Sequence, residues 1–205
     1  VARDGIAGWG ECVPYPRYGD TLDSVTAQIA ALPKGITRAD LQTALPPGSA
    51  RNALDCALWD WQAKQLGKPV WQLARLAEPK PVAIAYTLSL NTPEAMQAEA
   101  AKQAHRPILK IKLGTPDDMP RLEAVRRGAP RSTLIIDANE GWTPEIYADL
   151  APHLVRLGVA LVEQPLPQGA DDMLAEIARP LPVAADESAH DAASLAGLKG
   201  KYDVV

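Results

Sequence analysis

The sequence has 205 residues, enough for one large domain or two small ones with an independently stable core. Its formal net charge is −4 and it has no basic run, so nucleic acids and anionic membrane surfaces are poor electrostatic partners. No apolar stretch reaches the roughly 18 residues that a membrane-spanning helix needs. We therefore expect a small-molecule partner, and neither nucleic acid nor membrane.

The two cysteines, Cys12 and Cys56, lie far apart and match no spacing of metal ligands. So few thiols predict reduced side chains packed in the core and a reducing, cytoplasmic compartment. The chain begins at Val1 without an initiator Met, just before a segment, residues 6–12, that has the pattern of a hairpin's second strand. We therefore expect the natural start of the protein to be missing.

Residues 14–20 are rich in Pro, Tyr and Gly and are predicted to form a surface loop, the kind of segment that often shapes a substrate pocket. Thr21 or Asp23 is expected to cap a helix that follows this loop and continues through Ile29.

A second helix is predicted over residues 50–66, because apolar residues recur there at i, i+3, i+4, i+7, i+8 and i+11. Ser49 is the expected N-cap, and Gly67 followed by Pro69 ends the helix. One face of this helix should therefore be buried.

From residue 81 onward, apolar strand patterns alternate with polar turns and amphipathic helices. The expected strands cover residues 82–89, 107–113, 133–137, 159–163, 183–186 and 202–205. Such βα units in series predict a parallel sheet, and the absence of a glycine-rich phosphate turn after the first strand favours a barrel over a doubly wound sheet. A closed barrel needs about eight strands, so we expect two or more to be missing.

Three of the turns share a Thr-Pro-acid sequence, in which Thr can cap a helix, Pro suits its first position and the acid favours its positive end. They are Thr92-Pro93-Glu94, Thr115-Pro116-Asp117 and Thr143-Pro144-Glu145.

Three of the predicted strands end in a carboxylate: Asp137, Glu163 and Asp186. In a parallel barrel the carboxyl ends of the strands meet at one mouth, so these side chains can share one ion. Carboxylate oxygens suit Mg²⁺, or alternatively Mn²⁺, whereas zinc is disfavoured because no His or Cys stands at a strand end. A single strand-end acid is more often a cap or a salt-bridge partner, but three on successive strands favour a metal site.

Lys110 and Lys112 are two residues apart on one predicted strand and should therefore point to the same face. A neighbouring ammonium and a nearby cation both lower the pKa of a lysine, toward that of a working base. We assign Lys112 as the base, and Lys110 as its electrostatic partner and a ligand of the substrate's carboxylate. A metal beside a lysine base suits removal of a proton next to a carboxylate.

Four motifs, in this order, resemble those of the enolase superfamily in its muconate-lactonizing branch: Lys110-Ile111-Lys112, Asp137-Ala138-Asn139, Glu163-Gln164-Pro165 and Asp186-Glu187-Ser188. Residues 8–12 and 52–60 are similar to the family's capping domain. The resemblance implies an α/β fold in which an α+β capping domain, residues 1–80, precedes a partial TIM-like (β/α) barrel, residues 81–205. Asn139 and Gln164 follow metal ligands directly and are expected to orient them by hydrogen bonds.

Residues 11–19 and 86–89 look most like the dipeptide epimerases, such as those acting on L-Ala-D/L-Glu. The resemblance implies that the loop around Arg17 and Tyr18 closes over the substrate, that Arg17 binds its side-chain carboxylate, and that Thr87 lies near the mouth. It also implies a second catalytic lysine beyond Val205, in an enzyme of roughly 320 residues by the missing barrel strands.

Two other functions stay open at this point. The same fold and metal would serve N-acylamino acid racemization or the dehydration that forms o-succinylbenzoate. The incomplete barrel also allows a non-catalytic fragment or assembly module, and self-association into a homo-oligomer is left open.

Overall fold

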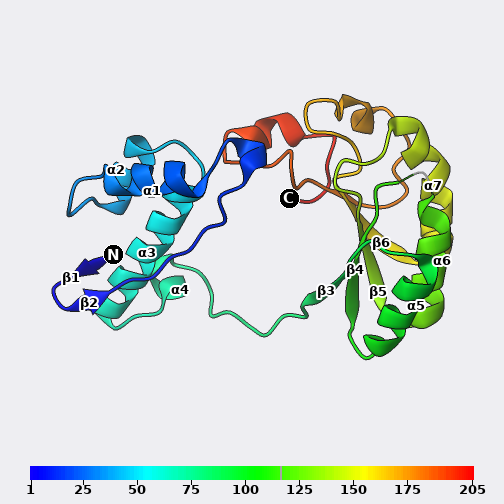
Figure 1. The fold of residues 1–205 in the computed structure, drawn as a ribbon, viewed down its shortest axis with the longest axis horizontal. Helices are drawn as coiled ribbons and strands as arrows, with labels where there is room; N and C mark the ends of the chain where they lie inside the picture. The colour runs from blue at the N-terminus through cyan, green and yellow to red at the C-terminus, as the bar shows by residue number, and fades with distance from the viewer. Residues whose placement is uncertain (116) are drawn as a thin grey trace. The chain divides into compact units, whose positions relative to one another are not determined.

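The computed structural model describes residues 1–115 and 117–205, which fold as two compact units, Val1–Pro81 and Val82–Val205. Unit 1 contains a two-stranded antiparallel sheet and a group of helices, and unit 2 contains a parallel sheet (Figure 1).

The elements of unit 1 are short except for one long helix. They are β1 (Ala2–Arg3), β2 (Ile6–Ala7), the 3-10 helix η1 (Pro16–Tyr18), α1 (Leu22–Ala30), α2 (Arg38–Ala44), α3 (Ser49–Leu66) and α4 (Val70–Leu73). Their buried core consists of Val25, Ile36, Leu41, Leu45, Ala50 and Leu58. Helix α2 is not predicted from the sequence, because its seven residues are too few to show a clear period.

The predicted cap at Thr21 is confirmed, since its side chain accepts a hydrogen bond from the amide of Ser24 at the start of α1. The predicted cap at Ser49 is wrong. The N-cap of α3 is Gly48, and the Ser49 hydroxyl donates instead to Asp20, whose carboxylate also accepts the Ser49 amide. The carboxylate of Asp20, 29 residues away in the sequence, therefore accepts a free amide at the start of α3.

Residues 8–10 lie directly on the backbone of α3. A Cβ on Gly10 would stand 2.0 Å from the carbonyl oxygen of Ala53, and one on Gly8 would stand 2.1 Å from that of Ala57. Because neither position has room for a side chain, the Gly-Trp-Gly sequence fixes how closely the chain approaches the helix.

Unit 2 contains five parallel strands that are hydrogen-bonded in chain order: β3 (Ala85–Leu88), β4 (Ile108–Lys112), β5 (Thr133–Asp137), β6 (Val159–Glu163) and β7 (Val183–Ala184). Its helices are α5 (Pro93–Lys102), α6 (Asp118–Gly128), α7 (Pro144–Arg156) and the 3-10 helices η2 (Asp172–Ala175) and η3 (Ser194–Leu198). Helices α5, α6 and α7 cover one face of the sheet (Figure 1).

The strand residues that face these helices are fully buried: Leu109, Ile111, Leu134, Ile136 and Val162 have no exposed surface. The alternating residues of β4, Lys110 and Lys112, are only partly buried on the other face. The sheet thus has an apolar face under the helices and a face that carries charge.

The Thr-Pro-acid prediction is confirmed at two of its three positions, because Thr92 and Thr143 are the N-caps of α5 and α7. It is wrong at the third, where Asp117 is the N-cap of α6 and Pro116 lies outside the described residues. The carboxylate of Asp118 accepts hydrogen bonds from both the amide and the hydroxyl of Thr115. The Thr115 side chain is therefore not the N-cap of α6.

The expected alternation of strand and helix changes after β6. The connections after β6 and β7 contain the 3-10 helices η2 and η3 in place of α-helices, and the first of them is rich in proline. The predicted strand over 202–205 is reduced to two isolated bridges, Val204 with Ala184 and Tyr202 with Lys199, and the amide of Tyr202 donates to the carbonyl of Leu198.

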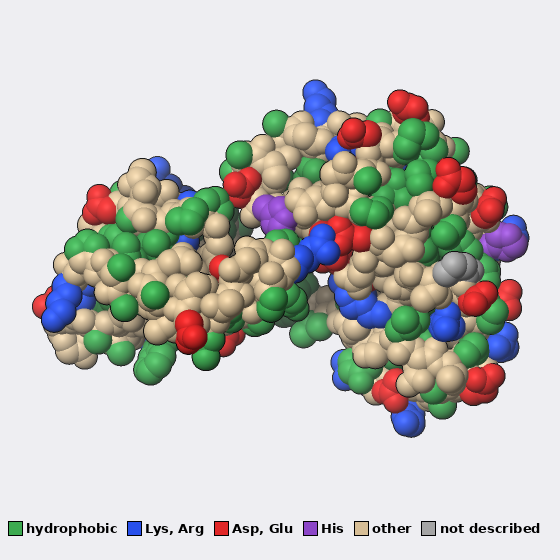
Figure 2. All heavy atoms as spheres, turned by 45° about the horizontal axis from the view of Figure 1, so that its top comes forward, with side chains coloured by type: hydrophobic (Ala, Val, Ile, Leu, Met, Phe, Trp, Pro, Cys, Tyr) green, Lys and Arg blue, Asp and Glu red, His purple; other side chains and the backbone are tan. Residues whose placement is uncertain are grey.

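Both thiols are free, with Cys12 half-buried and Cys56 exposed, so the expectation of a buried thiol is wrong for Cys56. Within the two described ranges, no helix is long and apolar enough to cross a membrane. On the face drawn in Figure 2, acidic and basic side chains of unit 2 are interspersed.

Candidate metal centre

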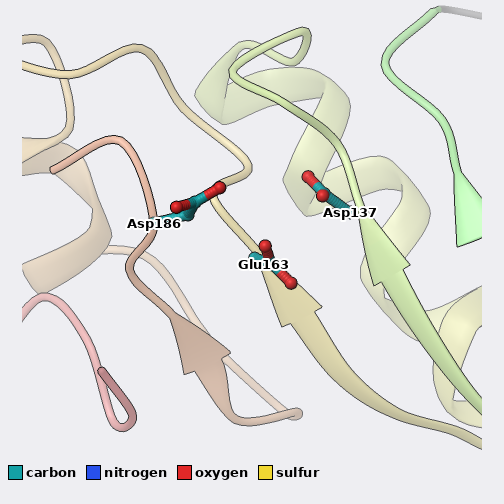
Figure 3. A group of neighbouring side chains, drawn as sticks. All are labelled: Asp137, Glu163 and Asp186. Carbon is teal, nitrogen blue, oxygen red and sulfur yellow. The ribbon is translucent and has the colours of Figure 1, made fainter. Parts of the chain in front are cut away.

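The three predicted metal ligands lie together at the carboxyl ends of neighbouring strands. Asp137 ends β5, Glu163 ends β6, and Asp186 stands on the loop after β7 (Figure 3). One carboxylate oxygen from each lies within 4.8 Å of the other two. The strand register accounts for this, because Asp137 pairs with Glu163 and Glu163 pairs with Ala184, two residues before Asp186.

Asp137 is the buried member of the cluster and is held through its side chain. Its Oδ2 accepts hydrogen bonds from Lys112 Nζ at 2.6 Å and Lys110 Nζ at 2.8 Å, and its Oδ1 accepts the Asn139 amide at 3.0 Å. Burial alone would raise the pKa of this carboxyl, but the two lysines and the amide outweigh it, and the pKa lies below its ordinary value. Asp137 is therefore ionised.

Glu163 is shifted in the opposite direction. Burial raises its pKa, the charges of Asp137 and Asp186 raise it further, and the hydrogen bond from Lys110 at 2.7 Å only partly compensates. The site thus holds more negative charge than its two lysines neutralise, which is the condition under which a divalent cation binds.

The pKa of Lys110 is set here by its carboxylate neighbours, and its expected lowering beside a bound cation stays a prediction. Burial does lower it, but hydrogen bonds and charge from Asp137 and Glu163 more than compensate, so the pKa of Lys110 is raised. Two carboxylates within 2.8 Å of Lys110 Nζ oppose the lowering of its pKa by the neighbouring Lys112 ammonium.

Lys112 also contacts the loop after β5. Its Nζ donates to Asn139 Oδ1 at 2.7 Å, and Asn139 Nδ2 donates to Glu187 Oε1 at 3.1 Å. Because Glu187 can only accept from this amide group, the Asn139 oxygen is turned toward Lys112. Asn139 therefore contacts both a ligand of the candidate metal and the candidate base.

Asp186 is the exposed member of the cluster and is held through its backbone. Its amide donates to Gln164 Oε1 at 3.0 Å, and its carbonyl accepts from the Ala189 amide in a turn. Gln164 has no exposed surface and a left-handed φ of 36°, an unfavourable conformation for this residue type. The backbone is thus turned sharply directly after the ligand Glu163.

The loops after β4 and β5 interlock beside the lysines. A Cβ on Gly141 would stand 2.3 Å from the carbonyl oxygen of Gly114, so these backbones touch. The buried carboxylate of Asp118 joins the same loops, accepting the amide of Gly114 at 2.8 Å and the indole of Trp142 at 2.9 Å. This arrangement sets the spacing between the two strand ends.

The predicted substrate-binding residues fall in both units. Thr87 is paired with Lys110 in the sheet register, so the two share a strand level and a face. Arg17 and Tyr18 belong to unit 1, in η1, where the Arg17 guanidinium stands 5.8 Å from the centre of the Tyr18 ring. Their role toward a substrate stays a prediction.

The donor set fits a hard divalent cation. Asp137, Glu163 and Asp186 supply oxygen ligands from one buried, one partly buried and one exposed residue, so the open side of the cluster is the side of Asp186. Lys110 and Lys112 both contact Asp137, so their ammonium groups lie beside the candidate metal site. The arrangement can therefore neutralise a carboxylate and remove a proton next to it.

Sequence reasoning did not identify Asp171, Lys201 and Tyr202, which form a buried polar group behind the Asp186 loop. No motif marks them, because their contacts join residues about 30 positions apart. Glu187 entered the sequence analysis only as part of the Asp186-Glu187-Ser188 motif, with no role of its own. In the structure, its Oε2 is buried without a hydrogen-bond partner among the described residues.

The chain is similar to known proteins along its whole length. Residues 1–74 match the model of the mandelate racemase/muconate lactonizing enzyme N-terminal domain, and residues 72–203 match that of the enolase C-terminal domain-like family. The chain is 45% identical to the L-Ala-D/L-Glu epimerase of Escherichia coli K12 and 42% identical to an N-acetyl-D-glutamate racemase of Pseudoalteromonas, in each case over its whole length.

It is also similar to a solved enolase family member from Agrobacterium tumefaciens with homology to dipeptide epimerases, which holds sodium and L-Ala-L-Glu. The TM-score is 0.94 with 48% identity, over 98% of this chain and 64% of that one. The chain spans 66% of the Escherichia coli relative and 67% of the Pseudoalteromonas relative. By its two domain matches, its parallel sheet and its relatives, the chain belongs to the mandelate racemase/muconate lactonizing branch of the enolase superfamily.

Proposed function

We propose that these 205 residues are the greater part of a metal-dependent epimerase that inverts a carbon next to a carboxylate, most simply in a dipeptide such as L-Ala-D/L-Glu. The proposal rests on one observation: Lys110 and Lys112 lie together with the three carboxylates at one edge of the sheet.

Mg²⁺, with Mn²⁺ as an alternative, is the proposed cofactor, and Asp137, Glu163 and Asp186 would hold it. When bound, the cation would neutralise the charge that develops on the substrate carboxylate as the proton leaves. Lys110, which contacts Asp137 and Glu163 in this structure, would bind a substrate oxygen when these carboxylates hold a cation.

Lys112 is the proposed base, which takes the proton from the substrate carbon onto Nζ. Its position is set by Asp137 Oδ2 and Asn139 Oδ1, which accept two of its three hydrogens in this structure. In the neutral amine that acts as base, Cε and the two hydrogens held by these acceptors leave one tetrahedral position for the lone pair, so these contacts orient the proton transfer. Gln164, through the Asp186 amide, would hold the third carboxylate in place.

The proposed substrate class rests on the relatives, since one carries the name L-Ala-D/L-Glu epimerase and a solved structure holds L-Ala-L-Glu. A dipeptide that ends in Glu presents an extra anion, and Arg17 is the proposed partner for it, with Tyr18 beside it and Thr87 near Lys110. The division of the protein into a capping domain over residues 1–80 and a barrel from residue 81 is part of this proposal.

Epimerization needs a second group that returns the proton on the opposite face of the carbon. We place that group in the sequence that the longer relatives have beyond the matched region. A cytoplasmic location, expected from the few cysteines, and a homo-oligomeric state stay predictions.

The test is proton exchange in D2O with the complete protein, Mg²⁺ and L-Ala-L-Glu, followed by NMR. We expect deuterium at the α-carbon of the Glu residue together with the appearance of L-Ala-D-Glu. Lys112→Gln should slow the exchange by at least about 100-fold, since a positioned base contributes that much or more. Lys102→Gln is the matched control, because the Lys102 side chain is 71% exposed on α5.

Failure of the unchanged protein to exchange or epimerize any dipeptide would contradict the proposed substrate class. Equal rates for Lys112→Gln and Lys102→Gln would instead contradict the assignment of the base.

N-acylamino acid racemization is the second candidate, because the Pseudoalteromonas relative is an N-acetyl-D-glutamate racemase. The same assay with N-acetyl-D-glutamate separates the two, since a racemase should exchange this compound faster than any dipeptide. Turnover of neither class, in a protein that binds Mg²⁺, would favour the non-catalytic alternative.

A further inference from the structure

The side-chain amide of Gln164 has only one orientation that its surroundings accept. Its Oε1 accepts the amides of Asp186 at 3.0 Å and Ser188 at 3.1 Å, and its Nε2 donates to the carbonyl of Leu166 at 2.9 Å. Turning the amide over would set its NH2 group against two N–H donors and its oxygen against a carbonyl. The loop that carries Asp186 is thus tied to the end of β6 through one buried side chain.

Two hydroxyl groups complete the surroundings of Gln164. Nε2 lies 2.9 Å from Ser188 Oγ and 2.8 Å from the Tyr202 hydroxyl, both of which are buried. A hydroxyl can donate or accept, so these two groups support the required orientation only if their hydrogens point away from Gln164.

Asp171 makes the hydrogens point away. Its Oδ2 accepts from Ser188 Oγ at 2.7 Å and from the Tyr202 hydroxyl at 2.7 Å, so both hydroxyls donate to the carboxylate and offer lone pairs to Gln164. Burial raises the pKa of Asp171, but Lys201 at 2.6 Å and the two hydroxyls outweigh it, and the pKa is below its ordinary value. A carboxylate accepts only, so the donor direction is fixed along the whole chain of bonds.

We propose that Asp171 is a positioning residue for the candidate metal centre: through Ser188, Tyr202 and Gln164 it holds the backbone of Asp186 where that carboxylate can share an ion with Asp137 and Glu163. The side chain of Asp171 is 2% exposed, and Gln164 has no exposed surface, so water cannot substitute for either. The inference rests on the proposed metal centre. It adds Asp171, the N-cap residue of η2, which would act on the metal only through its neighbours.

The test compares Asp171→Asn with Asp172→Asn in the complete protein. An Asn side chain must set its NH2 group either against the two hydroxyls or against the Lys201 ammonium, so it cannot replace both carboxylate oxygens, whereas Asp172, 95% exposed and also near Lys201, lies outside the chain of bonds. Titration calorimetry with Mg²⁺ should show an affinity at least about 10-fold weaker for Asp171→Asn, as for other residues that orient metal ligands. Asp172→Asn should bind within twofold of the unchanged protein, and a high Mg²⁺ concentration should restore turnover in Asp171→Asn.

Thermal melting without Mg²⁺ shows whether each variant folds. If Asp171→Asn does not fold, Tyr202→Phe decides, since it removes one hydroxyl and keeps the ring. Weaker Mg²⁺ binding by that variant supports the inference, and unchanged binding overturns it.

Unchanged affinity in Asp171→Asn, or equal losses in both Asn variants, would also overturn it. Absence of Mg²⁺ binding by the unchanged protein would instead overturn the proposed metal centre, and this inference with it.

Discussion

The two faces of the parallel sheet are made by the same strands and carry opposite chemistry. Toward α5, α6 and α7, residues such as Leu109 and Ile136 are fully buried among apolar neighbours. On the other face, Lys110, Lys112 and Asp137 form ion pairs at 2.6–2.8 Å.

The core and the candidate metal site are separated by a single residue step along a strand, because successive side chains point to opposite faces. Substitutions on the helix-covered face should lower the free energy of unfolding and leave metal affinity alone. Substitutions on the charged face should mainly lower metal affinity.

The largest effect on stability is expected from Leu109→Ala. Leu109 has no exposed surface, so its truncation loses the transfer free energy of the side chain and leaves a cavity, at a cost of about 3 kcal/mol. Denaturant unfolding measures the loss, and calorimetry on the folded fraction should give the Mg²⁺ affinity of the unchanged protein. A loss of affinity comparable to that of a ligand variant would break the separation of the two faces.

Asp137→Asn should have the largest effect on metal binding, weakening Mg²⁺ by at least about 100-fold, since the buried ligand is lost. Lys110 and Lys112 lose a shared, fully buried acceptor while Glu163 loses a repelling neighbour, so the free energy of unfolding without metal should fall by less than the roughly 3 kcal/mol expected for Leu109→Ala. Calorimetry and metal-free denaturation measure the two quantities separately. A large stability loss without metal would show that the charged face also holds the fold.

Asp186→Asn should weaken Mg²⁺ binding less, by about 10-fold or more, because Asn keeps one oxygen and the backbone of residue 186 is still held by Gln164. Its side chain is exposed, so the metal-free stability should stay within about 0.5 kcal/mol. The same two measurements apply. An affinity loss larger than that of Asp137→Asn would reverse the ranking of the ligands.

The smallest effect at neutral pH is expected from Tyr147→Phe on α7. The Tyr147 hydroxyl is buried without a hydrogen-bond partner among the described residues, so its removal should change stability by less than about 1 kcal/mol. Burial raises the pKa of Tyr147 to about 12, above the value of about 10 for an unfolded chain. The protonated form favours folding, so this contribution is full below about pH 10 and is lost as pH rises toward 12.

Unfolding of both proteins between pH 8 and 12 measures that contribution. The stability of the unchanged protein should fall relative to Tyr147→Phe above about pH 10, and parallel curves would contradict the raised pKa of Tyr147.

The strands and the cluster of three carboxylates could be predicted because their signals are local. A run of apolar residues that ends in an acid predicts a buried strand and places the carboxylate at the strand's carboxyl end, as at Asp137 and Glu163. The caps at Thr92 and Thr143 likewise depend on residues within one helical turn.

What could not be predicted depends on distant partners. Ser49 and Thr115 have good capping side chains, but Asp20 and Asp118 take their hydroxyls. The Asp171 contacts to Ser188 and Tyr202 leave no trace in local sequence, because they exist only after η2 and the last residues pack behind β7. The absence of an α-helix between β6 and β7 was in principle readable from the prolines of that connection, but the segment after β7 has no proline to signal the same change.

The contact between Gly114 and Gly141 limits how this enzyme family member can be re-engineered. Libraries aimed at new substrates usually vary the loops at the mouth, and here two of those loops touch backbone to backbone. Any side chain at Gly141 would push the loop after β5 away from that after β4, and with it Asp137 away from Lys112. Diversity is therefore better introduced elsewhere at the mouth, with both glycines kept.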